Sequence, residues 1–133
     1  MLTLEIVTPA GRSYTGEVEM VTLPAAGGQI GVLPRHAPML TRIEPGEILV
    51  RTRGGEEVLA VGEGLVAVTG DRVAIVTDMA IKASDIDEVK VEEARQRALA
   101  RLADKISDEE VATVNASLAR ALTQLRVKKR RRP

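Results

Sequence analysis

The sequence has no cysteine, no tryptophan and no phenylalanine among its 133 residues, and it holds one tyrosine and one histidine. Without cysteine the chain forms no disulfide, carries no thiol nucleophile and offers no thiolate metal site. The lone His36 excludes a histidine-rich metal centre, and Tyr14 alone cannot form a surface that stacks on single-stranded nucleic acid. No apolar run approaches the about 20 residues that span a bilayer, and no signal-peptide pattern is present. We therefore expect a soluble, cytosolic chain with no direct membrane insertion.

Charge is balanced overall but unevenly placed. Lys and Arg together number 19, as do Asp and Glu. Residues 1–83 hold seven basic and ten acidic residues, whereas residues 84–133 hold twelve basic and nine acidic ones. Five of the positive charges are consecutive, at 128–132. This asymmetry indicates two parts of different character, and we expect one domain over 1–83 and a second over 84–133.

Short apolar or alternating runs, separated by turns that contain glycine or proline, fill the first domain. A turn signal every ten or so residues is typical of a β-sandwich or barrel. We expect eight to ten strands before residue 80, with 73–77 as the last of them, and a turn over 24–28. The clearest strand runs are 2–8, 17–23, 47–53, 57–61, 65–69 and 73–77.

After residue 83 the apolar period lengthens to that of helices. Ser84, with Asp87 three residues later, predicts the cap of a helix that reaches Ala103, and Ser107 with Glu110 predicts the cap of a second helix. Because the break at 104–106 is short, the two helices should pack as antiparallel neighbours. The second helix carries one apolar stripe, made of Val111, Val114, Leu118, Ala121, Leu122 and Leu125.

These patterns together predict an α+β chain, with an N-terminal all-β sandwich of about ten strands followed by a C-terminal antiparallel two-helix hairpin. The hairpin is rich in alanine, so each helix buries little area. At about 25 cal/mol per Å² of buried apolar surface, the stripe holds the second helix by a few kcal/mol before ordering costs. We expect a hairpin that can leave its partner surface when another partner competes.

No group of residues has the pattern of a catalytic or metal site. His36 lies between two prolines, with no serine in a nucleophile-elbow context, so we interpret it as a structural or docking residue. Gly62 and Gly64 lack the third glycine and the following helix of a dinucleotide-binding loop, which favours a turn between strands. Carboxylates gather where they favour the positive end of a helix dipole: Asp85, Asp87, Glu88, Glu92 and Glu93.

The basic tail at 128–132 leaves three interpretations open. It could contact nucleic acid with affinity from counterion release, although no recognition motif accompanies it. It could equally be a solvated terminus or a contact for an acidic protein partner. The residues alone thus predict a β-sandwich adaptor with a detachable helical arm. The alternative is a small β-barrel nucleic-acid-binding protein with a basic tail.

The stretch with the most specific pattern is a glycine-bracketed strand that leads into a stiff proline corner. It reads Gly28-Gln29-Ile30-Gly31-Val32-Leu33-Pro34-Arg35-His36-Ala37-Pro38-Met39-Leu40-Thr41. It resembles the signature Gly-Glu-Leu-Gly-Ile-x-Pro-Gly-His-Ala-Pro-Leu-Leu-Thr of the epsilon subunit of bacterial rotary, proton-translocating ATP synthases. Residues 62–68 with 73–78 resemble that family's Gly-Gly-x-x-x-Val strand pair, and residues 119–127 resemble its second helix. Gln29 stands where the family usually has an acidic residue, and Arg35 where a glycine is common.

The resemblance implies a non-catalytic subunit of the central rotor, peripheral to the cell membrane at its cytoplasmic face. Such a subunit is clamped to the gamma subunit and rests on the ring of c subunits. The expected gamma contacts are Gly31, His36, Ala37, Pro38 and Met39. The expected contacts to the c ring lie in one turn, at Gly27, Gly28 and Gln29.

In this family the hairpin either folds on the sandwich or extends along gamma into the alpha/beta catalytic hexamer, where it blocks rotation and inhibits ATP hydrolysis. The sequence leaves open which state dominates, how strong the inhibition is and whether sodium replaces protons. In the extended state, positive residues would face acidic segments of the beta subunits. These residues are Arg120, Arg126, Lys128, Lys129 and Arg130, with the tail continuing to Arg132.

Some members of the family also bind ATP, through an Ile-Asp-x-x-Arg-Ala motif and further arginines. By resemblance the candidate residues here are Ile86, Asp87, Lys90, Arg97 and Arg120. Lys90 and Val91 depart from the motif at its two closing positions. Since lysine lacks the planar fork of arginine, we expect weak regulatory ATP binding or none, and no other cofactor.

Overall fold

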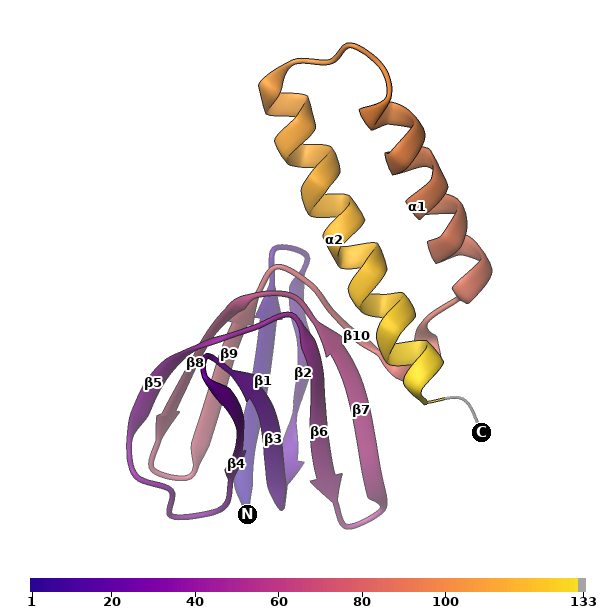
Figure 1. Ribbon diagram of the computed structural model, residues 1–133. Helices are drawn as coiled ribbons and strands as arrows, with labels where there is room; N and C mark the ends of the chain where they lie inside the picture. The colour runs from indigo at the N-terminus through magenta and orange to yellow at the C-terminus, as the bar shows by residue number, and fades with distance from the viewer. Residues whose placement is uncertain (132–133) are drawn as a thin grey trace.

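The computed structural model describes residues 1–131, which form ten β-strands, a short 3-10 helix and two long helices (Figure 1). The strands are β1 (Leu2–Thr8), β2 (Gly11–Val18), β3 (Met20–Ala25), β4 (Gly28–Val32), β5 (Met39–Ile43), β6 (Gly46–Thr52), β7 (Gly55–Val61), β8 (Gly64–Thr69), β9 (Arg72–Thr77) and β10 (Ala80–Lys82). The helices that follow are η1 (Ala83–Asp85), α1 (Glu88–Leu102) and α2 (Asp108–Arg130). The predicted sandwich with a C-terminal helix hairpin is confirmed.

The strands form one continuous sheet that folds over a common core (Figure 1). Its order is β10-β7-β6-β3-β5-β8-β9-β1-β2, with β4 paired to β3. Every pair is antiparallel except β1 with β9, which run parallel from Thr3↔Arg72 to Val7↔Val76. The core follows from the period of two: Leu2, Leu4 and Ile6 of β1 are fully buried, while the residues between them face outward.

Two strand predictions were wrong at their boundaries. The run 17–23 divides into the end of β2 and the start of β3, because Val18 and Val21 are both buried and their spacing of three breaks the alternation. The predicted turn at 24–28 is shorter, since β3 continues through Pro24 to Ala25, where it pairs with Gly28 of β4. The strand β10 was missed because three residues are too few to show a period.

The cap of the first helix was also placed wrongly. Ser84 lies in η1, and the cap of α1 is Asp87, whose carboxylate accepts hydrogen bonds from the backbone N–H groups of Val89 and Lys90. The reason is Ile86, which is extended and buried and therefore interrupts the helix before it starts. The cap of α2 is confirmed, since the Ser107 hydroxyl accepts from the Glu110 N–H at 3.2 Å.

Gly62 and Gly64 lie at the predicted turn between β7 and β8, where the chain passes close to residues 76–78. A Cβ atom at Gly62 would overlap the Asp78 carboxylate, and one at Gly64 would overlap the backbone of Val76 and Thr77. The turn is closed by the Thr77 hydroxyl, which donates to the Glu63 carbonyl at 3.0 Å. These glycines therefore serve packing.

The hairpin touches the sandwich mainly through the C-terminal part of α2, which packs on β6, β7 and η1. A second, small apolar cluster forms this contact, made of Ala60, Ala83, Ile86 and Val127 with Val58, Ile81 and Val91 around it. The other end of the hairpin, with the α1–α2 connection, projects beyond the sandwich (Figure 1). Within the predicted stripe Ala121 is buried and Leu122 is exposed. Val127, two residues past the end of the predicted stripe, is buried and was missed.

Candidate functional site

The proline corner connects β4 to β5 and is held rigidly by backbone hydrogen bonds. The Arg35 N–H donates to the Asp71 carboxylate at 2.9 Å, which ties the corner to the β8–β9 turn. The His36 N–H donates to the Leu33 carbonyl at 3.2 Å, and the His36 Nδ1 lies 2.7 Å from the Ala37 carbonyl oxygen. One nitrogen of the imidazole is thus engaged by its own loop, and a docking role of His36 stays a prediction.

Arg35 adopts a left-handed backbone conformation, with φ of 67°. It is the one non-glycine residue in residues 1–131 with a positive φ. This conformation brings Cβ close to the backbone and is costly for residues other than glycine. It explains why a glycine suits this position, and it leaves the Arg35 side chain exposed at the tip of the corner.

Four of the five predicted gamma-contact residues are contiguous, from His36 to Met39, and the last of them begins β5. Gly31 lies in β4, opposite Thr22, and a Cβ there would meet only the methyl end of the flexible Met20 side chain, which would have to shift. The structure therefore brings these residues to one end of β4. Their contact with a partner stays a prediction.

The predicted c-ring turn lies at the other end of β4. Gly27 and Gly28 have φ values of 91° and 135°, which glycine adopts readily, and both are exposed together with Gln29. Gly28 and Gln29 begin β4 and Gly31 lies near its end, so at the usual rise of a strand about 7 Å separates Gln29 from Gly31, and about 16 Å separates Gly28 from Leu33 of the corner. The two predicted contacts thus lie at opposite ends of one short strand.

An exposed apolar surface next to the corner was not predicted. It consists of Leu40, Leu65 and Val76, which are 73%, 50% and 60% exposed, and we call it the β5–β9 patch. The register joins them on one face, since Leu65 lies opposite Val76 in β9 and opposite Arg42 in β5, two residues from Leu40. The signal was present in the sequence: β8 and β9 are continuous apolar runs, yet no other part of residues 1–131 covers the outer face of either strand.

The predicted ATP residues are only partly brought together. Lys90 and Arg120 line a shallow pocket between α1 and α2, but Arg97 does not line it. Ile86 packs in the small apolar cluster and Asp87 caps α1, so both have structural roles. The Arg120 guanidinium donates to the Ser117 hydroxyl at 3.1 Å and lies 3.8 Å from the Asp78 carboxylate. A nucleotide at this pocket would therefore compete with contacts that the chain already makes.

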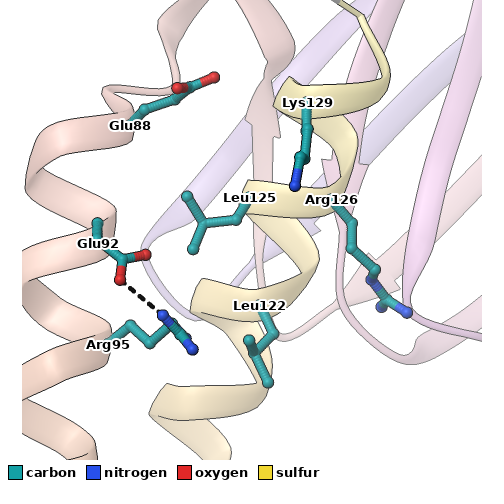
Figure 2. Close-up of a pocket in the computed structure, with 7 residues that line it drawn as sticks. All are labelled: Glu88, Glu92, Arg95, Leu122, Leu125, Arg126 and Lys129. Atoms are coloured by element: carbon teal, nitrogen blue, oxygen red, sulfur yellow. Dashed lines mark hydrogen bonds and ion pairs between the residues drawn. The ribbon is translucent and has the colours of Figure 1, made fainter.

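A larger groove lies between the two helices (Figure 2). Leu125 points into it from α2, whereas Arg126 points away from α1. On α1, the Glu92 carboxylate accepts from Arg95 at 2.6 Å and from Gln96 at 2.9 Å, and these hydrogen bonds, the one from Gln96 most strongly, lower the pKa of Glu92. The complete lining is Glu88, Glu92, Arg95, Leu122, Leu125, Arg126 and Lys129.

Most of the predicted inhibitory residues contact the chain's own sandwich. The Lys128 ammonium donates to the Ala83 carbonyl at 3.0 Å, Arg120 lies near Asp78, and Arg130 lies 3.6 Å from the Glu47 carboxylate. Arg126 instead bonds the Thr123 hydroxyl of its own helix, and Lys129 lines the groove. Arg132 of the predicted tail lies outside the described residues. Sequence reasoning placed Arg131 in the basic tail but missed its pairing with Glu47, because the two residues are far apart along the chain.

The part of the chain that the structure describes offers little for other chemistry. No cluster of His, Asp or Glu in residues 1–131 could hold a metal ion, and no helix there is long and apolar enough to cross a bilayer. The single aromatic ring, Tyr14, packs half-buried against the main core. Burial and, to a smaller extent, the Glu57 carboxylate raise the pKa of Tyr14.

Both parts of the chain match known sequence families. The ATP synthase Delta/Epsilon chain beta-sandwich domain matches residues 1–83, and the ATP synthase Delta/Epsilon chain long alpha-helix domain matches residues 84–129. The ATP synthase epsilon chain of Halorhodospira halophila is 39% identical over 127 residues, which cover 94% of this chain and 90% of that one.

Solved structures share the fold. A chain of the Euglena gracilis mitochondrial ATP synthase superposes with a TM-score of 0.71 at 20% identity, covering 94% of this chain and 79% of that one. A chain of the Tetrahymena thermophila mitochondrial ATP synthase, from its central stalk and c ring, gives 0.54 at 14% identity, covering 93% and 95%. At these identities the likeness shows the fold alone.

The strained corner yields a stability prediction. Replacing Arg35 with glycine removes the Cβ that opposes the left-handed conformation, so the free energy of unfolding should rise by up to about 1 kcal/mol. The measurement is thermal unfolding followed by circular dichroism. Arg35→Ala is the matched control, since it removes the guanidinium but keeps the Cβ. Equal midpoints for the two variants would contradict a backbone origin of the strain.

Proposed function

Because this chain belongs to the ATP synthase delta/epsilon chain family, we propose that it serves as the epsilon subunit of a proton-translocating ATP synthase. It is a non-catalytic subunit of the central stalk that couples gamma to the c ring, peripheral to the cell membrane at its cytoplasmic face. The observation that carries this proposal is the match of both family domains, in order, to consecutive parts of the chain. The same match favours a stalk subunit over the nucleic-acid-binding alternative.

The gamma-binding surface is the proline corner together with the β5–β9 patch. Leu40, Leu65 and Val76 expose apolar area that no element of residues 1–131 covers, and Leu33 adds an exposed side chain at the corner. Apolar side chains that would be desolvated at the centre of an interface are typical of protein contacts, which bury about 800 Å² per partner. A rigid loop loses little entropy on binding, and this corner is fixed by Asp71 and two prolines.

The c ring is contacted by the turn of Gly27, Gly28 and Gln29. Its position at the far end of β4 allows the sandwich to contact the gamma subunit and the c ring at the same time. Because Gln29 is neutral, this contact depends on hydrogen bonds rather than on an ion pair.

The proposed contact with gamma can be tested by a substitution in the β5–β9 patch. Leu40→Glu places a charge on a surface that would be desolvated on binding. The affinity for purified gamma subunit, measured by calorimetry, should therefore fall at least about tenfold. Val89→Glu is the matched control, because Val89 is equally exposed but lies on α1. Circular dichroism should show both variants folded. Unchanged affinity of the Leu40 variant would exclude the patch from the interface.

The hairpin inhibits ATP hydrolysis when it leaves the sandwich and extends along gamma into the alpha/beta hexamer. Its docked state depends on a small apolar cluster and a few polar contacts, while its far end has no cover from the sandwich. Released positive residues of α2 would then face acidic segments of the beta subunits. They are Arg120, Arg126, Lys128, Lys129 and Arg130.

Removing the arm tests this regulation. Deletion of residues 106–133 should raise ATP hydrolysis by the assembled complex and leave its assembly intact, because the sandwich keeps both rotor contacts. Hydrolysis is measured on complexes of equal subunit content, and Lys105→Gln in the full-length chain is the control. If hydrolysis by the truncated complex equals that of the intact one, the hairpin does not inhibit.

Regulatory ATP binding to the isolated chain should be weak or absent. Lys90 offers one point charge where an arginine would offer a fork, and Arg120 is already engaged by Asp78 and Ser117. Calorimetric titration with ATP should therefore detect no tight complex, and Lys90→Arg should bind ATP more strongly than the natural sequence. Tight binding by the natural sequence would contradict the expectation.

A further inference from the structure

Glu47 stands out among the charged residues of β6 because it is buried. It is 7% exposed and is one of three buried polar residues in the described chain. Its carboxylate accepts two hydrogen bonds from Arg131, one from Nε at 3.2 Å and one from Nη2 at 2.5 Å. The Arg130 guanidinium lies 3.6 Å away on the same carboxylate. Two cations at the end of α2 thus share one acid of the sandwich.

Within residues 1–131, the contact of Glu47 with Arg131 is the strongest of the described polar contacts between the hairpin and the sandwich. Arg120 and Asp78 are 3.8 Å apart and both are partly exposed, which makes a weak ion pair. Lys128 contributes a single hydrogen bond to a carbonyl. A two-pronged bond from a guanidinium to a buried carboxylate is stronger, because the charges are screened less and the geometry fits both oxygens.

The burial of Glu47 is caused by the hairpin itself. The carboxylate lies in a cleft whose other wall is α2, at Thr123, Arg126, Val127 and Arg130. When α2 departs, water replaces both arginines and the carboxylate is not left as a buried, unpaired charge. The pair can therefore open without disrupting the sandwich core, as a reversible fastening must.

We propose that Glu47 is the latch that retains the hairpin on the sandwich, with Arg131 and Arg130 as the groups that it holds. The regulatory meaning of this latch depends on the proposed inhibitory function. Arg130 cannot pair with Glu47 and with an acidic segment of a beta subunit at once, so docking and inhibition exclude each other. The strength of the Glu47 contact then sets the fraction of chains whose arm is free.

Hydrogen exchange of the full-length chain tests the latch without other subunits. Glu47→Gln and Arg131→Gln should each accelerate exchange of the amides around Val127 about tenfold or more, because each removes the same charged hydrogen bonds. Combining them should add little to either change alone, since both act on one contact. Arg131→Gln alters only an exposed helix end, so it tests the contact with Glu47 even if the Glu47 variant folds poorly.

Two control variants test whether the loss of any nearby charge, rather than loss of the Glu47 contact, accelerates exchange. Glu56→Gln removes an exposed carboxylate of the adjacent strand β7 whose partner, Arg51, lies in the same sheet. Lys129→Gln removes a charge from the same turn of α2 without a contact to Glu47. Both should leave exchange unchanged. Unchanged exchange in Glu47→Gln, or additive effects of the two latch variants, would overturn the proposal.

The assembled ATP synthase separates this proposal from the inhibitory function. If both hold, Glu47→Gln frees the arm and lowers ATP hydrolysis relative to the natural sequence. Faster exchange with unchanged hydrolysis would support the latch and refute inhibition by the hairpin. Unchanged exchange would refute the latch whatever the hydrolysis rate.

Discussion

The packing of small aliphatic side chains inside one folded sheet is the constraint on which this molecule depends. Leu2, Leu4 and Ile6 of β1 meet Val73 and Ile75 of β9, and among residues 1–131 the half-buried Tyr14 is the one aromatic side chain that packs against this core. Such a core needs every strand in register, because a slip by one residue would turn its apolar set outward. The result is a stiff body whose loops, rather than its strands, meet other molecules.

Rigidity and detachability are divided between two apolar clusters. The large one closes the sandwich, and the small one around Ile86 and Val127 fastens the hairpin. The small cluster contains far fewer apolar residues than the large one, and in the proposed latch the charged contacts at the end of α2 decide whether the hairpin stays docked. In the proposed stalk function, this separation would let the arm move while the sandwich keeps its contact with gamma.

Much of this architecture could be predicted from residue patterns, and the exceptions have physical reasons. Alternation in β1 is a local signal, so this strand was found, as were the short helix connection and the Ser107 cap. Ser84 was misplaced because the burial of Ile86, a tertiary effect, competes with a local cap. The pairing of Glu47 with Arg131 was missed because no pattern links residues 84 positions apart. The contact residues came from a family resemblance, since exposed side chains carry no periodicity of their own.

The parallel pairing of β1 with β9 also determines when the sandwich can close. β1 can pair with β9, at Thr3 and Arg72, only after β9 has been synthesised. During synthesis the first strand therefore has only β2 beside it until most of the domain has left the ribosome. Contacts of such long range slow folding, whereas the hairpin forms from neighbours in sequence. A chain interrupted before β9 therefore exposes an unpaired edge of β1, which is the kind of edge that chaperones and aggregates both recognise.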